Sequence, residues 1–205
     1  MNDMLSDFLF VSEFGCKESA LIDDKNAIKV CADRAYRDFC RTLHFKKTIG
    51  DCERKKFKKK LIDMIIIEGC ENLYKKNIKE EYDETHQKLC EKLCDIFNEA
   101  DILDADHKFS YGQAQKWVNM TMKYFVLMKN EGSNDRLLSI MHIPVDDYVL
   151  KAFDPEGKKG YKEKPWSKWD EDTYLSFINN LRELVKAEPD NNTCFDWEYN
   201  IWNNK

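Results

Sequence analysis

Glycine and proline are scarce in this chain, with seven and four among 205 residues. Tight turns depend on these two residue types, so their scarcity disfavours a turn-rich fold and favours a helical one. Few segments alternate polar and apolar residues with period two, which argues against an extensive β-sheet. No apolar run approaches the roughly 20 residues that a membrane-spanning helix requires, so we expect no membrane association.

The first 16 residues also lack the basic start and the small-residue cleavage site of a secretory signal. We expect a soluble, cytoplasmic and monomeric protein. The apolar side chains of this segment are expected to pack on the body of the protein: Phe8, Leu9, Phe10, Val11 and Phe14.

Cysteine is not lacking, but the eight cysteines follow no disulfide-framework spacing. A reducing compartment would keep them as thiols. His86, Cys90 and Cys94 lie four residues apart on an expected helix, yet ligands along one helical stripe rarely converge on a single metal ion. Because Leu89 and Leu93 flank this stripe, we interpret it as core and predict no metal site.

The charge distribution bears on nucleic-acid binding. A net charge of −5 weighs against it, but phosphate contacts need local cations rather than a positive total. Residues 41–60 hold nine lysines and arginines against two acidic residues. This run is either a solvated helix face or a DNA contact surface.

The apolar periodicity predicts an all-α fold. Helices are expected over about 24–43, 54–74, 80–97, 109–128, 173–186 and 194–202, with irregular stretches at 129–134 and 154–165. We expect one compact helical unit over 1–205. The helices of 1–100 and 166–205 would form two lobes around a central segment, 109–153.

That central segment carries the most specific pattern. It opens with Tyr111-Gly112-Gln113-Ala114-Gln115-Lys116 and closes with Ile143-Pro144-Val145-Asp146. Gly112 and Ala114 suit a tight turn before a helix, whose free N–H groups could hold a phosphate. Lys116, in the first turn of such a helix, would lose its proton more easily, as a lysine nucleophile requires.

The pattern resembles that of the helix-hairpin-helix DNA glycosylases, and of their 8-oxoguanine branch in particular. There the hairpin reads roughly Gly-x-Gly-x-Lys, and Pro-Val-Asp follows. Gly112, Ala114 and Lys116 match the hairpin, and Pro144-Val145-Asp146 matches the later motif. A bacterial group of glycosylase-like proteins is similar in its Tyr-Gly-x-Ala-Gln-Lys and His-x-Pro-Val-Asp patterns, to which His142 also conforms. The resemblance covers about Ser110 to Leu150.

The resemblance implies two helical lobes flanking a cleft and a base-excision enzyme that acts on double-stranded DNA. Lys116 would attack the sugar of an oxidised purine nucleotide, with 8-oxoguanine the leading substrate, and Asp146 would assist. The resulting Schiff base would also give AP lyase activity, without a cofactor. The predicted hairpin contacts to the DNA backbone come from Tyr111, Gly112, Gln113, Ala114 and Gln115. A possible base pocket comprises His142, Pro144, Trp197 and Trp202.

Other interpretations of the same residues stay open. Asp147 beside Asp146 could supply the carboxylate instead. Lys116 could be a surface lysine and Asp146 an N-cap, because Pro-Val-Asp-Asp is also a good helix start. The chain could then be a non-catalytic DNA-binding module or a helical interaction protein. Catalysis requires the Lys116 amine and the Asp146 carboxylate within roughly 3–6 Å at the floor of an open cleft.

Overall fold

The computed structural model describes residues 2–129, 135–188 and 192–203, and their fold is all-α, as predicted. The only β contact within these ranges is an isolated bridge between Phe45 and Leu103. Short 3₁₀ turns lie at Glu18–Ala20, Cys40–Thr42 and Trp166–Lys168. The helices are α1 (Asn2–Phe14), α2 (Asp24–Phe39), α3 (Asp51–Leu61), α4 (Ile67–Tyr74), α5 (Lys79–Glu99), α6 (Tyr111–Lys129), α7 (Asp135–Ile140), α8 (Asp147–Phe153), α9 (Glu171–Ala187) and α10 (Cys194–Asn203).

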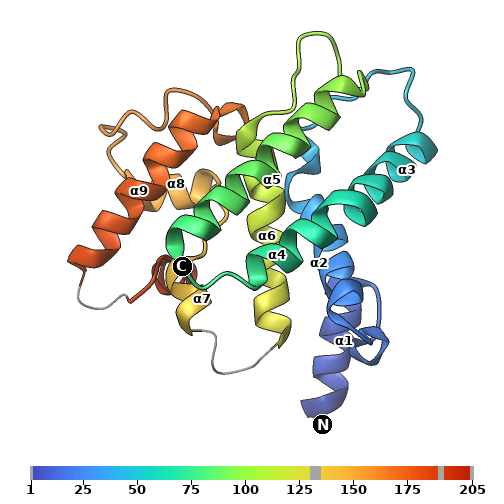
Figure 1. Ribbon diagram of the computed structural model, residues 1–205, viewed down its shortest axis with the longest axis horizontal. Coiled ribbons are helices and arrows are strands. Elements are labelled where there is room, and N and C mark those ends of the chain that lie inside the picture. The colour runs from blue at the N-terminus through green and yellow to red at the C-terminus, as the bar shows by residue number, and fades with distance from the viewer. Residues whose placement is uncertain (1, 130–134, 189–191, 204–205) are drawn as a thin grey trace.

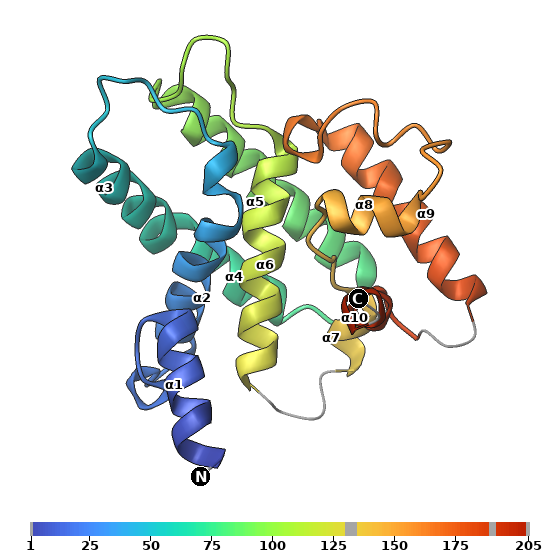
Figure 2. The ribbon, with the colours of Figure 1, turned by 180° about the vertical axis from the view of Figure 1, so that it is seen from behind.

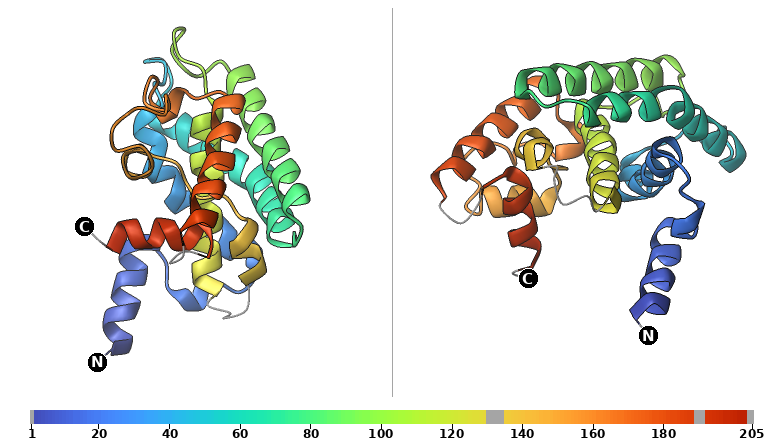
Figure 3. Two further views of the ribbon diagram at one scale, coloured as in Figure 1. Left: turned by 90° about the vertical axis from the view of Figure 1, so that its left-hand side faces the viewer. Right: turned by 60° about the horizontal axis from the view of Figure 1, so that its bottom comes forward.

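Helix α6 is the central element (Figures 1 and 2). Helices α1 to α4 lie on one side of it, α7 to α10 lie on the other, and α5 crosses both groups. Viewed from below, α1 and α10 project from the same side of the molecule (Figure 3, right). Within the described ranges no helix is both long and apolar enough to cross a membrane.

The central position of α6 follows from its sequence. Its first twelve residues are all buried, which is unusual for a helix with several polar side chains. Helix α2 packs closely along it because Ala27, Ala32 and Ala35 present small side chains at the contact. The indole Nε1 of Trp117 donates to the Ala32 carbonyl oxygen at 2.9 Å, so this large side chain is buried with its polar atom satisfied.

The predicted helix over 54–74 consists of three joined pieces. Helices α3 and α4 are connected by a π-helical turn, Ile62–Ile66, which adds a wider turn to an otherwise continuous rod. In the isoleucine run, Ile65 and Ile66 are buried as expected, at 5% and 0% exposure, while Ile67 is only partly buried.

Two details differ from the sequence prediction. Helix α2 ends at Phe39 instead of continuing to residue 43, because a 3₁₀ turn follows at Cys40–Thr42. The prediction that the N-terminal apolar side chains pack inward is wrong for Phe8, Leu9 and Val11, which are exposed on α1. Phe14 does pack, with its ring 5.7 Å from that of Tyr124. The stretch 154–165 is irregular, as predicted, and 130–134 of the other predicted loop lies outside the described residues.

Candidate functional site

The fold brings Lys116 and Asp146 into contact, although 30 positions separate them. The Lys116 Nζ atom lies 2.8 Å from Asp146 Oδ2. Lys116 comes from the second turn of α6, and Asp146 precedes α8. Their side chains are 6% and 24% exposed, so both are largely removed from water. The expected meeting of the amine and the carboxylate is therefore confirmed.

Asp146 uses its two oxygens for different purposes. Oδ1 accepts from the backbone N–H groups of Tyr148 and Val149, both at 3.0 Å, and so caps the N-terminus of α8. Oδ2 faces the Lys116 ammonium. Burial disfavours the charged carboxylate, but Lys116 and the two N–H donors outweigh it and hold the Asp146 pKa below its usual value. Asp146 is consequently ionised near neutral pH.

Gln115 fixes the segment that carries Asp146 against α6. Its side-chain amide accepts from the Val145 N–H and donates to the Val145 carbonyl oxygen, each at 3.2 Å. One side chain thereby pairs with both polar backbone groups of the residue before Asp146. Asn119, one turn further along α6, donates to the Ile143 carbonyl oxygen at 3.0 Å.

A buried polar network extends from Asn119 to the far side of the molecule. Asn119 contacts His86 Nε2 and the Tyr174 hydroxyl, both at 2.9 Å. The Tyr174 hydroxyl is also 2.9 Å from His142 Nδ1, and His142 Nε2 lies 2.9 Å from Asp83. Arg182 completes the network with two 2.8 Å contacts to Asp83 and a 2.9 Å bond to the Ile140 carbonyl oxygen. These contacts hold residues 140–146 against α5, α6 and α9.

Lys116 and Asp146 line a cavity of about 450 Å³, which we call the lysine cavity. Helices α2, α6 and α10 contribute most of its lining. Five cationic side chains face three carboxylates around it. The lining residues are Arg34, Arg37, Asp38, Arg41, Lys116, Met120, Lys123, Tyr124, Asp146, Glu198 and Trp202.

Glu198 is the least expected residue of the lysine cavity. Its side chain is 3% exposed, and Oε1 pairs with Lys123 Nζ at 2.8 Å. Oε2 is buried and has no hydrogen-bond partner among the described residues. Burial raises the pKa of Glu198, while Lys123 and Lys116 oppose that rise. Two carboxylates of one cavity therefore have pKa values shifted in opposite directions, Asp146 downward and Glu198 upward.

The hairpin predicted over residues 111–115 is not formed, because Tyr111 already begins α6. Gly112 lies inside the helix, and its N–H donates to the Trp169 carbonyl oxygen at 3.0 Å. A Cβ atom at Gly112 would lie 1.8 Å from the Trp166 carbonyl oxygen, so this glycine is required for close packing. Ala114 is helical and completely buried, and its replacement of a glycine causes no backbone strain.

The five residues predicted to grip DNA are buried here: Tyr111, Gly112, Gln113, Ala114 and Gln115. The free N–H groups expected at this helix start are also engaged, since the Gln113 N–H bonds to Ser110 Oγ at 3.1 Å. Lys116 is the sixth residue of α6, so it lies beyond the first turn, where the helix dipole acts most strongly.

The residues predicted for a base pocket are divided by the fold. Trp202 lines the lysine cavity, is 40% exposed, and its ring lies 4.5 Å from that of Tyr148. Pro144 and Trp197 are buried in the core, and His142 belongs to the buried network. His86 and Cys90 are core residues as interpreted, and no group of three metal-ligating side chains was found in the described ranges.

The basic run of residues 41–60 is partly neutralised within the protein. Lys46, Lys58 and Lys59 form ion pairs with Asp101, Asp33 and Asp63. Arg41 is exposed and reaches the lysine cavity. The run is therefore neither a purely solvated face nor a continuous cationic surface.

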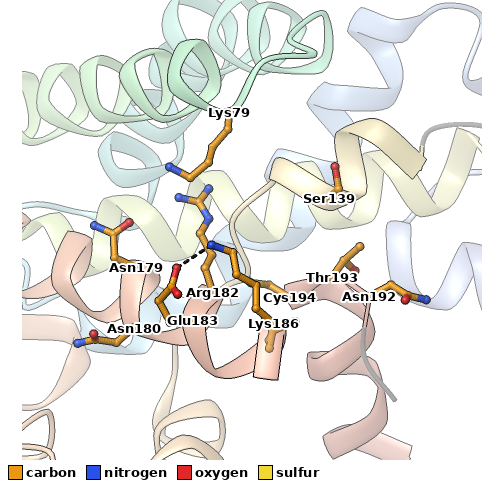
Figure 4. A pocket seen from close by; sticks show the side chains of 11 residues that line it. Lys79, Ser139, Asn179, Asn180, Arg182, Glu183, Lys186, Asn192, Thr193 and Cys194 are labelled. Carbon is orange, nitrogen blue, oxygen red and sulfur yellow. Dashed lines mark hydrogen bonds and ion pairs between the residues drawn. The ribbon is translucent and has the colours of Figure 1, made fainter. Parts of the chain in front are cut away.

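Another cavity, of about 360 Å³, lies between α9, α7 and the start of α10 (Figure 4). Arg182 lines it, but this guanidinium is already paired with Asp83. Glu183 and Lys186 pair with each other at 2.7 Å in the same wall. None of the predicted site residues line it, and its charges are largely satisfied from within.

No protein-family model, curated protein or solved structure significantly matches this chain.

Proposed function

We propose that this protein is a DNA glycosylase with AP lyase activity whose nucleophile is Lys116. The observation that carries the proposal is the contact of a buried lysine with an ionised aspartate in a cavity lined by five cationic side chains. A lysine that reacts with sugar carbons needs a water-poor setting and a nearby carboxylate, and it has both here. The resemblance to helix-hairpin-helix glycosylases supplies the substrate class, an oxidised purine in duplex DNA.

In the proposed reaction, Lys116 Nζ forms a bond to C1′ of the damaged nucleotide while the bond from C1′ to the base breaks. The departing base takes the bonding electrons and a proton. The protonated secondary amine gives a proton to O4′ as the bond from C1′ to O4′ breaks, and the sugar opens to a Schiff base. Loss of a C2′ proton to water then drives β-elimination, which breaks the bond from C3′ to its phosphate oxygen. Asp146, held ionised, stabilises the positive charge that develops on the sugar.

Lys116 must lose a proton before it can attack, and the two carboxylates differ as acceptors. Asp146 has a lowered pKa, so it accepts a proton poorly. Glu198 has a raised pKa and a buried, unpartnered oxygen in the wall of the same cavity. We assign Glu198 as the base that takes the Lys116 proton and Asp146 as the electrostatic partner.

The damaged nucleotide must leave the duplex to reach the lysine cavity, at a cost of a few kcal/mol for unstacking. Trp202 is the exposed aromatic side chain on the cavity wall, and we propose that it stacks on the extruded base. The leading substrate is 8-oxoguanine, by the resemblance alone.

The direct test is reduction by borohydride during incubation with a duplex that carries one 8-oxoguanine. We expect a covalent protein–DNA adduct that disappears in Lys116→Gln. Lys129→Gln, on the same helix, is the matched control and should retain the adduct. An adduct that persists in Lys116→Gln would refute the nucleophile assignment.

A second candidate is a non-catalytic DNA-binding module. It is favoured by the 2.8 Å ion pair itself, because the same geometry would hold a charged, unreactive Lys116 against the cap of α8. Binding to duplex DNA without any adduct, on oxidised and abasic substrates alike, would favour this alternative. Absence of binding would leave a helical interaction protein.

A further inference from the structure

A second cavity, of about 560 Å³, lies beside the lysine cavity and shares Arg41 with it. We call it the histidine cavity, after His44 and His107 in its wall. Its other walls come from the start of α6 and from the 3₁₀ turn at Trp166–Lys168. The lining residues are Arg41, Thr42, His44, Leu103, Asp106, His107, Lys108, Ser110, Gln113, Ser167 and Lys168.

The charges of the histidine cavity are not neutralised from within. In the described chain, Arg41, Lys108 and Lys168 form no ion pair, and Asp106 is the single carboxylate of the lining. In the lysine cavity, by contrast, Lys116 and Lys123 are each paired with a carboxylate. Three unpaired cations converging on one hollow suit an anionic ligand.

The two imidazoles add donors to this cavity. The rings of His44 and His107 are stacked, with their centroids 3.9 Å apart and their planes inclined by 27°. His107 Nδ1 is buried and has no hydrogen-bond partner among the described residues. A buried polar atom without a partner is costly unless a ligand or water satisfies it. An oxygen-rich anion would supply that partner.

The histidine cavity also stands at a suitable place relative to Lys116. Arg41 lines both cavities, and Gln113 of the histidine cavity precedes Lys116 by three residues on α6. A nucleotide whose sugar reaches Lys116 therefore carries its adjoining phosphate towards Arg41. The Arg41 guanidinium can bind such a phosphate with two parallel N–H groups.

We propose that the histidine cavity binds the DNA backbone phosphate that flanks the nucleotide held at Lys116. This assignment rests on the proposed function, and it relocates the phosphate contact from the buried start of α6 to Arg41, Lys108 and Lys168. The ligand class is a phosphodiester, recognised by charge and not by base sequence.

The test uses duplexes that contain a tetrahydrofuran abasic analogue, which binds but cannot form a Schiff base. Each phosphate near the analogue is replaced, one at a time, by a neutral methylphosphonate, and affinity is measured. We expect one position at which the wild-type protein loses roughly tenfold in affinity, the scale of one charge-assisted hydrogen bond. The double variant Arg41→Gln/Lys168→Gln should bind every duplex more weakly than the wild type. Its affinity should not fall further when that one phosphate is replaced.

Arg41 and Lys168 are exposed, so the double variant should fold normally, which circular dichroism can verify. Lys92→Gln, an exposed lysine on α5, is the control and should keep the wild-type pattern. A double variant that stays as sensitive as the wild type at every position would overturn the proposal. So would an absence of any sensitive position.

The phosphate assignment and the proposed chemistry fail separately. If Lys116 forms the adduct but no methylphosphonate position depends on Arg41, the lyase activity is supported and the phosphate subsite is refuted. The reverse result would establish the subsite on a protein that binds DNA without cleaving it.

Discussion

Helix α6 has two polar faces that are built in opposite ways. On one face, Gln115 and Asn119 belong to a buried network in which each amide is used to hold a neighbouring segment. On the other face, Lys116 and Lys123 border a cavity, and Glu198 keeps an unpartnered oxygen. Adjacent residues, Gln115 and Lys116, thus serve structure and candidate chemistry respectively. Gln115 and Lys116 are 0% and 5% exposed, so burial alone does not separate the two roles.

The sharpest contrast between the faces is expected in Lys116→Gln. Removing the amine should reduce DNA cleavage by roughly a thousandfold or more while leaving binding to damaged duplex nearly unchanged. The substitution keeps a side chain that can hydrogen bond to Asp146, so the melting temperature should change little. Single-turnover cleavage and binding measured on the same preparation provide the comparison. Parallel loss of binding and cleavage would contradict a nucleophilic role.

Glu198→Gln should reduce the cleavage rate by about a hundredfold, the usual scale for a general base. In the wild type the rate should rise with pH as Glu198 loses its proton, and its raised pKa places this rise above the ordinary range of a glutamate. The variant should lack that ascending limb. A pH–rate profile of the same shape in both proteins would remove Glu198 from the mechanism.

On the structural face, Asn119→Leu should lower the free energy of unfolding by about 3 kcal/mol. The change leaves His86, Tyr174 and the Ile143 carbonyl oxygen without their partner in a buried network. Urea denaturation followed by circular dichroism measures the effect. Activity per folded molecule should fall far less than in Lys116→Gln, and an unchanged stability would show that the network is dispensable.

Gly112→Ala should destabilise the protein by about 2 kcal/mol, because the added methyl group meets the Trp166 carbonyl oxygen. Gly50→Ala is the matched control, since its nearest neighbour would be a flexible side-chain atom at 3.8 Å. Thermal unfolding of both variants tests the difference. Equal melting temperatures for the two variants would mean that the turn at Trp166–Lys168 moves aside at little energetic cost.

The smallest expected effect is a loss of fold stability at acid pH, caused by protonation of Asp83. Burial opposes ionisation of Asp83, but His142 and Arg182 reverse this and hold its pKa well below its usual value. A carboxylate with a lowered folded-state pKa stabilises the fold above its unfolded pKa of about 3.9 and loses that contribution as pH falls further. Stability should therefore decline in this acid range, and less steeply in Asp83→Asn. Parallel stability curves for the two proteins would exclude Asp83 as the source.

Apolar periodicity predicted the long helices from residue 24 onwards, but not α1. The pairing of Lys116 with Asp146 was expected from the resemblance of a spaced motif, not from periodicity. The sequence did not predict the burial of the segment from Tyr111 to Gln115. Gly112 suits both a turn and a close helix contact, and only the position of Trp166 distinguishes them. Glu198 was missed because its neighbours come from α2 and α6, and a lone glutamate in an aromatic segment gives no signal of that contact.

The capping role of Asp146 has a consequence for the timing of charge. Its carboxylate is anchored by two backbone N–H groups before any ligand arrives, so it cannot rotate towards solvent without uncapping α8. A positive charge that develops beside Oδ2 in the proposed reaction therefore meets a carboxylate already in place, which keeps the reorganisation energy low.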